Sequence, residues 1–216
     1  ELCSELGVGG VTPSYGLLKT IKDQIKIPVH VLIRPRSGDF TYSETEFEVM
    51  LRDIRLCVEL GFEGIVSGIL NNDFTLDKAR TAKLIEASGK MAFTFHRAFD
   101  WVKFPLETFQ QLQGLGVDYV LSSGQRESAP EGIDLLVELH SKAKQTVVMP
   151  GGGVRLDNLA LFKKMGFKAI HLSGIKMVQN LSEAPKISMN SIQLLEERAL
   201  AITDVETIQK VVTSVK

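Results

Sequence analysis

The chain has 216 residues, of which 44% are hydrophobic and 24% charged, a composition typical of one globular domain with a single core over residues 1–216. Its formal net charge of −1, without a block of five or more like charges, excludes the basic surface of a nucleic-acid-binding or membrane-surface protein. With only 2 cysteines and no apolar stretch of membrane-spanning length, we expect no disulfide framework, no membrane partner and no nucleic-acid partner.

Short apolar or β-branched runs recur along the chain, and each is followed by a helical pattern. Their centres lie about 22 to 34 residues apart, the length of one strand, one crossover helix and the return. These runs are therefore predicted to be parallel strands of one sheet. They cover residues 1–3, 29–34, 64–67, 91–96, 117–121, 146–149 and 168–172.

Helix signals occupy the intervening segments. Ser43 and Glu46 have the spacing of a capping box, and apolar residues recur at helical spacing behind them until Gly61. This pattern predicts a helix with one apolar face against the sheet. Other helix starts are indicated by a cap residue or a proline in the first turn, at Thr12 with Pro13, Pro105, Ser128 with Pro130, Asp157, and Asp204 for a last helix over 204–215.

Two α/β architectures fit this alternation, a doubly wound open sheet and a TIM (β/α)8 barrel. Barrels run to about 250 residues, and one further unit of about 28 residues would bring this chain to about 244 with eight strands. The open sheet requires a glycine fingerprint after its first strand, which the segment starting at Gly7 lacks at the sixth position. We therefore expect a TIM barrel that is N-terminally incomplete, with its first βα unit missing from this chain.

Polar residues gather where the predicted strands end, which is where barrels carry their function. Five of them, Glu1, Arg34, Arg36, His96 and Asp100, are candidate catalytic residues. Two arginines at one strand end favour an anionic ligand, and His96 or Glu1 could serve as acid or base. The alternative is that these arginines form ion pairs at the rim.

An anion-binding site is predicted at the ends of later strands. Backbone N–H groups and hydroxyls could hold an anion at Ser122, Ser123, Gly151, Gly152, Gly153 and Ser173. The glycines could equally serve tight turns. Because no lysine ends a strand, Schiff-base aldolase chemistry lacks its nucleophile.

The two cysteines differ. Cys57 lies on the apolar stripe of its helix and is expected to be a core residue, whereas Cys3 ends a strand. A thiolate there would be a soft ligand for Cu(I), although one cysteine needs a second soft donor.

Several motifs resemble the copper homeostasis protein CutC family. They are IRPRSGDF at 33–40, FHRAFD at 95–100 and MPGGG at 149–153, with ELCS at 1–4, GGVTPS at 9–14 and SSG at 122–124 in the same order. The resemblance implies a cytoplasmic TIM barrel associated with copper handling and Cu(I) binding, with another strand before Glu1 and with Cys3 as the matching copper ligand. The cysteine that partners it in some members has no counterpart here. Residues 175–202 match no motif and are expected to be a polar excursion before the final helix.

Two functions follow as hypotheses. The first is a Cu(I)-binding copper homeostasis protein, whose partner is the copper ion. The second is a barrel enzyme acting on a small anionic molecule, a phosphorylated or carboxylated metabolite. A homo-oligomer is compatible with either.

Overall fold

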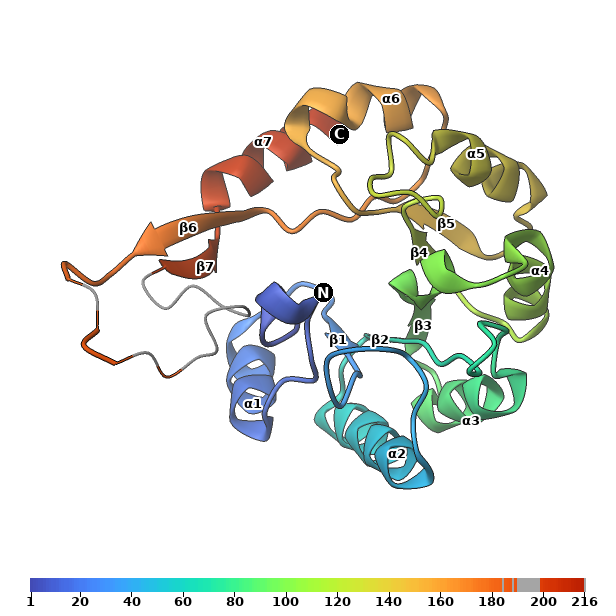
Figure 1. The fold of residues 1–216 in the computed structure, drawn as a ribbon, viewed down its shortest axis with the longest axis horizontal. Coiled ribbons are helices and arrows are strands. Elements are labelled where there is room, and N and C mark those ends of the chain that lie inside the picture. Colours follow the sequence, from blue (N-terminus) through green and yellow to red (C-terminus); the bar gives the residue numbers. More distant parts are fainter. Residues whose placement is uncertain (184, 188, 190–198, 216) are drawn as a thin grey trace.

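The computed structural model describes residues 1–183, 185–187, 189 and 199–215. Its centre is a curved sheet of five parallel strands in chain order (Figure 1). The strands are β1 (His30–Leu32), β2 (Gly64–Ser67), β3 (Ala92–Phe95), β4 (Tyr119–Ser122) and β5 (Val147–Pro150). Single parallel bridges extend the sheet at both edges, from Leu2 to Val31 and from His171 to Gly151. The predicted strands thus lie side by side in one sheet. The first, at residues 1–3, and the last, at 168–172, each pair with the sheet through a single bridge.

Six helices follow the strands and lie on the outer side of the arc (Figure 1). They are α1 (Tyr15–Gln24), α2 (Glu44–Leu60), α3 (Lys78–Ser88), α4 (Pro105–Gly114), α5 (Ile133–Lys142) and α6 (Leu159–Lys164). Short 3-10 helices lie in three of the loops, η1 (Leu6–Val8), η2 (Arg97–Trp101) and η3 (Leu156–Asn158). This is the α/β order and curvature of a TIM-barrel wall. Within the described residues the sheet stays open between the Leu2 and His171 edges.

Local signals placed several helix ends correctly. The capping box is confirmed, since the Ser43 hydroxyl accepts from Glu46 N while the Glu46 carboxylate accepts from Ser43 N. The first helix begins later than predicted because Ser14, not Thr12, caps it, while the Thr12 hydroxyl accepts from Arg34 N at 2.8 Å.

Two later helix starts also move along the chain. The α5 helix begins at Ile133 rather than near Ser128, because Ala129 N donates to Gly152 O at 2.8 Å and ties that segment to the loop after β5. Asp157 lies inside η3, one turn ahead of α6.

The two faces of the sheet are buried differently. One face packs on the helices, with Val31, Ile65 and Phe93 in adjacent register and fully buried among helical core residues such as Met50 and Ile54. The opposite face carries buried residues that lie outside this cluster, Leu32, Val66 and Leu121. These line the concave side of the arc, as interior residues of a barrel do.

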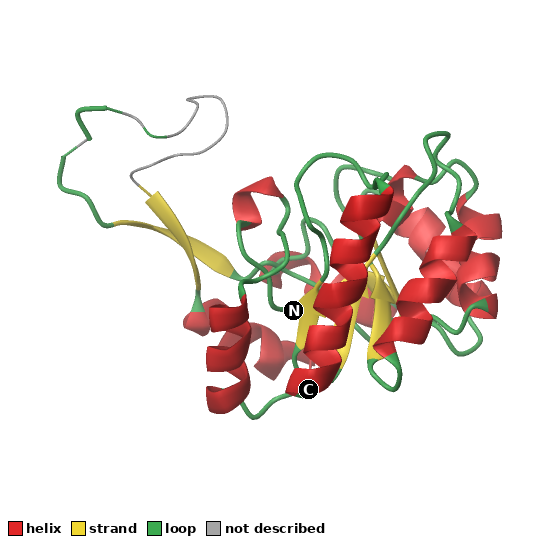
Figure 2. Cartoon of the chain, turned by 90° about the horizontal axis from the view of Figure 1, so that it is seen from below, coloured by secondary structure: helices red, strands yellow, loops and turns green. Residues whose placement is uncertain are grey.

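The C-terminal part differs from the barrel repeat. Strands β6 (Ile175–Gln179) and β7 (Ala199–Thr203) form an antiparallel ribbon that projects from the body (Figure 2), and α7 (Val205–Val215) packs on α6. The polar excursion predicted for 175–202 includes residues 184, 188 and 190–198, which lie outside the described residues.

The burial of Cys57 allows a stability test. Cys57→Ala should lower the free energy of unfolding by about 1 kcal/mol, because the fully buried sulfur on α2 leaves a small cavity in the helix–sheet core. Val58→Ala, the exposed neighbour on the same helix, should stay within about 0.5 kcal/mol of the parent. Equal effects in urea denaturation would contradict the packing of α2 described above.

Candidate functional site

A pocket of about 270 Å³ opens at the C-terminal ends of the strands, on the concave side of the sheet. We call it the mouth pocket. Its lining combines ionisable residues with an apolar wall. The ionisable residues are Glu1, Arg34, His96, Arg97 and His171, and the wall consists of Leu6, Val8, Gly9, Leu32, Phe40, Trp101 and Leu121. Candidates from distant parts of the sequence therefore share one concave site.

His96 follows β3 and is held on several sides. Its Nδ1 accepts from Ala98 N at 3.2 Å and so caps η2. The ring packs against Phe40, with 4.8 Å between ring centres, and a Cβ on Gly68 would stand 2.6 Å from it. Because Nδ1 accepts, the neutral ring carries its proton on Nε2, and no described residue accepts a hydrogen bond from that buried atom.

Burial and the Arg34 charge lower the pKa of His96 to about 3. The imidazole is therefore neutral throughout the physiological range. It can donate a hydrogen bond from Nε2, but it is unsuited to the role of a base that titrates near neutrality.

Arg34 follows β1 and is buried, with 6% of its surface exposed. Its Nη1 donates to the carbonyls of Val8 and Gly10, both at 2.8 Å, and its Nη2 donates to Gly38 O at 2.9 Å. The guanidinium also lies over the Phe40 ring, 5.2 Å from its centre. Arg34 contributes a charge to the pocket, while most of its hydrogen-bond donors hold the surrounding loops.

The predicted anion-binding hydroxyls already hold an anion, the carboxylate of Asp100. The Ser122 hydroxyl donates to it at 2.6 Å and the backbone N–H of Ser123 at 2.9 Å. The Ser123 hydroxyl lies 3.0 Å from the carboxylate and 2.6 Å from the carbonyl oxygen of Arg126, and its single proton can serve either acceptor. Arg97 Nε completes the set at 2.8 Å. Asp100 thus fills the site that the sequence suggested for a ligand.

Arg97 connects this cluster to the pocket. Its Nη2 donates to Ser123 Oγ at 2.9 Å, and 46% of its side chain is exposed. Within the described residues no group accepts from its Nη1. A Cβ on Gly152 would stand 3.2 Å from the guanidinium carbon, so the missing side chain there leaves room for Arg97.

Glu1 and His171 come from the two edges of the sheet and approach each other across the opening. Glu1 Oε2 lies 3.9 Å from His171 Nδ1. Burial lowers the pKa of His171, and the Glu1 carboxylate opposes this effect. This side of the pocket offers a carboxylate acceptor opposite the arginines.

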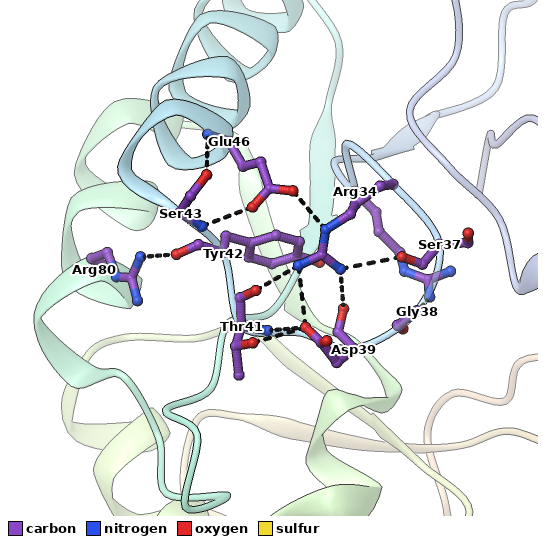
Figure 3. A network of polar contacts seen from close by, with 10 residues as sticks. Arg34, Ser37, Gly38, Asp39, Thr41, Tyr42, Ser43, Glu46 and Arg80 are labelled. Carbon is purple, nitrogen blue, oxygen red and sulfur yellow. Dashed lines mark hydrogen bonds and ion pairs between the residues drawn. The ribbon is translucent and has the colours of Figure 1, made fainter.

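Arg36 lies outside the mouth pocket. It belongs to a polar network beside α2, and Figure 3 shows its partners Asp39, Thr41 and Glu46. Its Nε pairs with Glu46 at 2.6 Å, its Nη2 donates to Thr41 O at 2.6 Å, and it stacks on the Tyr42 ring. Asp39 pairs with it as well. Arg36 therefore forms ion pairs at the rim, which is the alternative considered for the two arginines. Arg34 and Arg36 do not form a pair of free cations at one strand end.

The glycines and Ser173 do not line the mouth pocket either. Gly151 N donates to Ser122 O within the sheet, and a Cβ at this position would stand 2.4 Å from Leu121. Gly152 and Gly153 have positive φ angles of 94° and 70°, which the turn after β5 requires and which glycine adopts easily. Ser173 is exposed beyond the last bridge.

Cys3 is partly buried and lies beside Gly10, where a Cβ would stand 3.3 Å from its sulfur. Burial, and then the Glu1 charge, raise the pKa of the thiol. The sulfur is therefore protonated at neutral pH and is a weak ligand until it loses that proton.

Comparison with known proteins assigns the family. The profile of the CutC family matches residues 1–176. The chain belongs to the CutC family. A family protein CutC of Klebsiella pneumoniae strain 342 is 47% identical over 173 residues, covering 80% of this chain and 70% of that protein. Its counterpart in Proteus mirabilis is 43% identical over 199 residues, covering 91% and 80%.

Solved structures agree with the CutC assignment. A crystal structure from Streptococcus agalactiae, named as a candidate copper homeostasis protein CutC, superposes with a TM-score of 0.75 at 34% identity, covering 79% of this chain and 85% of that one. A structure named QR15, an aldolase, gives a TM-score of 0.53 at 12% identity over 71% and 72%. The second likeness concerns the barrel fold alone.

The described part of this CutC chain contains neither a cluster of metal-binding side chains nor a membrane-spanning helix. Across the part of the chain that the structure describes, no three His, Cys, Asp or Glu side chains gather in a way that could hold a metal ion. Among the same residues, no helix combines the length and apolar character needed to cross a membrane.

The aromatic wall of the pocket was not predicted. Phe40 and Trp101 lie with ring centres 4.9 Å apart, and Phe74 continues the row at 6.4 Å from Trp101. The available signal was position, because Trp101 directly follows the FHRAFD motif. Arg97 lies inside that motif but was not among the predicted catalytic or anion-binding residues.

The neutral state of His96 has a consequence for stability. The folded pKa of about 3 lies below the ordinary 6.5, so the unfolded chain binds an extra proton between these values and stability falls as pH falls below 6.5. His96→Asn keeps an acceptor for Ala98 N but cannot take up that proton. Between about pH 6 and 4.5, its free energy of unfolding should fall less steeply, by up to about 1.4 kcal/mol per pH unit. Identical slopes in urea titrations would show that His96 is not buried as described.

Asp100 should be a major source of stability at the pocket rim. Asp100→Asn places an amide among donors that now serve a buried carboxylate, and should cost about 2 to 4 kcal/mol in thermal or urea unfolding. Asp23→Asn, which removes the same charge from an exposed pair on α1, should change little. Similar small effects for both variants would argue against the described network.

Proposed function

We propose that this chain takes part in copper homeostasis in the cytoplasm and that Cys3 is its Cu(I) ligand. Family membership supports the role, since the 34% identical Streptococcus agalactiae structure is named for copper homeostasis. Both cysteines are free thiols, as in proteins of a reducing compartment. The observation that carries the ligand assignment is the position of Cys3 at a sheet edge, within the segment that matches the family.

Cys3 alone does not complete a copper site. Cu(I) favours soft sulfur donors, and the only other cysteine, Cys57, is buried between α2 and the sheet, where burial raises the pKa of its thiol to about 12. The second sulfur in this proposal comes from outside the chain, from a small thiol or from Cys3 of a second copy in a homo-oligomer. The stoichiometry separates these two sources, because a shared site gives one copper per two chains.

A second candidate function is the binding of a small anionic metabolite in the mouth pocket. One observation favours it, the buried Nε2–H of His96, which lines the pocket without an acceptor. Buried donors without partners are rare in folded proteins and point to a bound acceptor. Glu1, which faces His171, is the remaining candidate acid or base if chemistry takes place there.

The copper proposal predicts a specific loss. In anaerobic titration against a competing Cu(I) chelator, Cys3→Ser should bind at least about tenfold more weakly, whereas Cys57→Ala should match the parent. Because the Cys3 pKa is raised and the ligand is the thiolate, binding releases a proton, so affinity should increase by up to about tenfold per pH unit from pH 6 to 8.

The control for unfolding is the circular dichroism spectrum of each variant. Unchanged copper affinity in Cys3→Ser would remove Cys3 as a ligand. Pure one-to-one binding without added thiol would exclude both external sources of the second sulfur.

A further inference from the structure

The mouth pocket has a polar end and an aromatic wall. At the polar end, His96 Nε2 and Arg97 Nη1 are donors that no described residue accepts from. The other wall is formed by the Phe40 and Trp101 rings and by aliphatic side chains. A ligand that satisfies both must carry an acceptor at one end and an apolar body at the other.

No neighbouring protein group can take the His96 proton. The charge that acts on His96 is that of Arg34, whose guanidinium is itself only a donor. The ring cannot turn away, because Nδ1 is bonded to Ala98 N and the ring packs closely on Gly68 and Phe40. An acceptor for this proton therefore has to come from outside the described residues.

The acceptor is better matched by a carboxylate than by a phosphate. The donors that would surround a phosphate dianion, the hydroxyls and N–H groups after β4, are already directed to Asp100. What remains is the neutral Nε2–H of His96, the buried Nε of Arg34 and the partly exposed Arg97 guanidinium, with the Glu1 carboxylate on the pocket lining as a negative charge. Such an environment suits a single negative charge.

The volume sets the size of the apolar body. About 270 Å³ lies below the range of roughly 300 to 1,000 Å³ typical of drug-sized ligand pockets. One planar ring or a short branched chain fits beside Trp101 and Phe40, where aromatic contacts add to apolar burial.

We propose that the mouth pocket binds a compact carboxylic acid with a planar apolar body, its carboxylate accepting from His96 Nε2 and pairing with Arg97, its body against Trp101 and Phe40. The proposal deepens the second candidate function and rests on it. It is independent of the copper proposal, which uses Cys3.

Trp101 provides the readout, because it is the only tryptophan of the chain and lines the pocket. Benzoate is the probe, and benzyl alcohol is the uncharged control of similar shape. Benzoate should quench or shift Trp101 fluorescence with saturation and raise the melting temperature, while benzyl alcohol should bind about tenfold more weakly. In Trp101→Phe the fluorescence signal disappears, but the thermal shift remains.

Matched variants test the two polar contacts. His96→Asn keeps the cap of η2 but removes the Nε2 donor and should weaken benzoate about tenfold, whereas His96→Gln, which can place an amide N–H in its stead, should recover part of the loss. Arg97→Gln should weaken benzoate at least about tenfold, while Arg55→Gln, on the exposed face of α2, should not change it.

The possible results distinguish failure of the carboxylate assignment from failure of the second candidate function, anion binding in the mouth pocket. Binding of phenyl phosphate or inorganic phosphate without binding of benzoate would overturn the carboxylate assignment and keep an anion site at the mouth. Equal binding of benzyl alcohol, or benzoate binding unchanged in both His96→Asn and Arg97→Gln, would overturn the polar end described here. Failure of every probe would overturn both the inference and the second candidate function.

Discussion

The mouth of this CutC chain depends on one buried cation. Arg34 is nearly inaccessible to solvent, and its guanidinium is bonded to carbonyl oxygens from two separate loops, at Val8 and Gly10 before α1 and at Gly38 after β1. Burying a charge without such partners would lower the stability of the fold by several kcal/mol. The position of Arg34 therefore determines the positions of these two loops. Because Arg34 follows β1 by two residues, the sheet itself sets the positions of both loops.

The same principle governs the rest of the site, where the protein supplies its own counter-charges. Asp100 receives the donors after β4, Arg97 pairs with Asp100, and Arg36 is neutralised by Glu46 and Asp39 away from the pocket. Among the described residues, the buried Arg34 guanidinium is bonded to carbonyl oxygens and forms no ion pair. Selectivity for a ligand then comes from the direction of a few unpaired donors, since such donors distinguish acceptors more sharply than a diffuse field does.

The sequence predicted correctly those features that depend on residues close together in the chain. The strand run at 64–67, the capping box of Ser43 and Glu46, and the helix start at Pro105 depend on residues within one turn of one another, and all three are confirmed. The direction of Arg36 depends on Glu46, which another element supplies, so adjacency to Arg34 wrongly suggested a shared role. The filling of the Ser122 and Ser123 site by Asp100 is a contact across 22 residues that no local pattern contains.

The two proposed functions use different atoms but share one loop. Cys3 lies against Gly10, and the carbonyl of Gly10 is one of the oxygens that hold Arg34, which lines the mouth pocket. Gly10 has a φ of 86° and no space for a side chain, so this position of the loop requires glycine. The surroundings of the Cys3 sulfur and one support of the pocket therefore belong to the same loop. The two proposed sites use different side chains for their ligands and share this stretch of backbone.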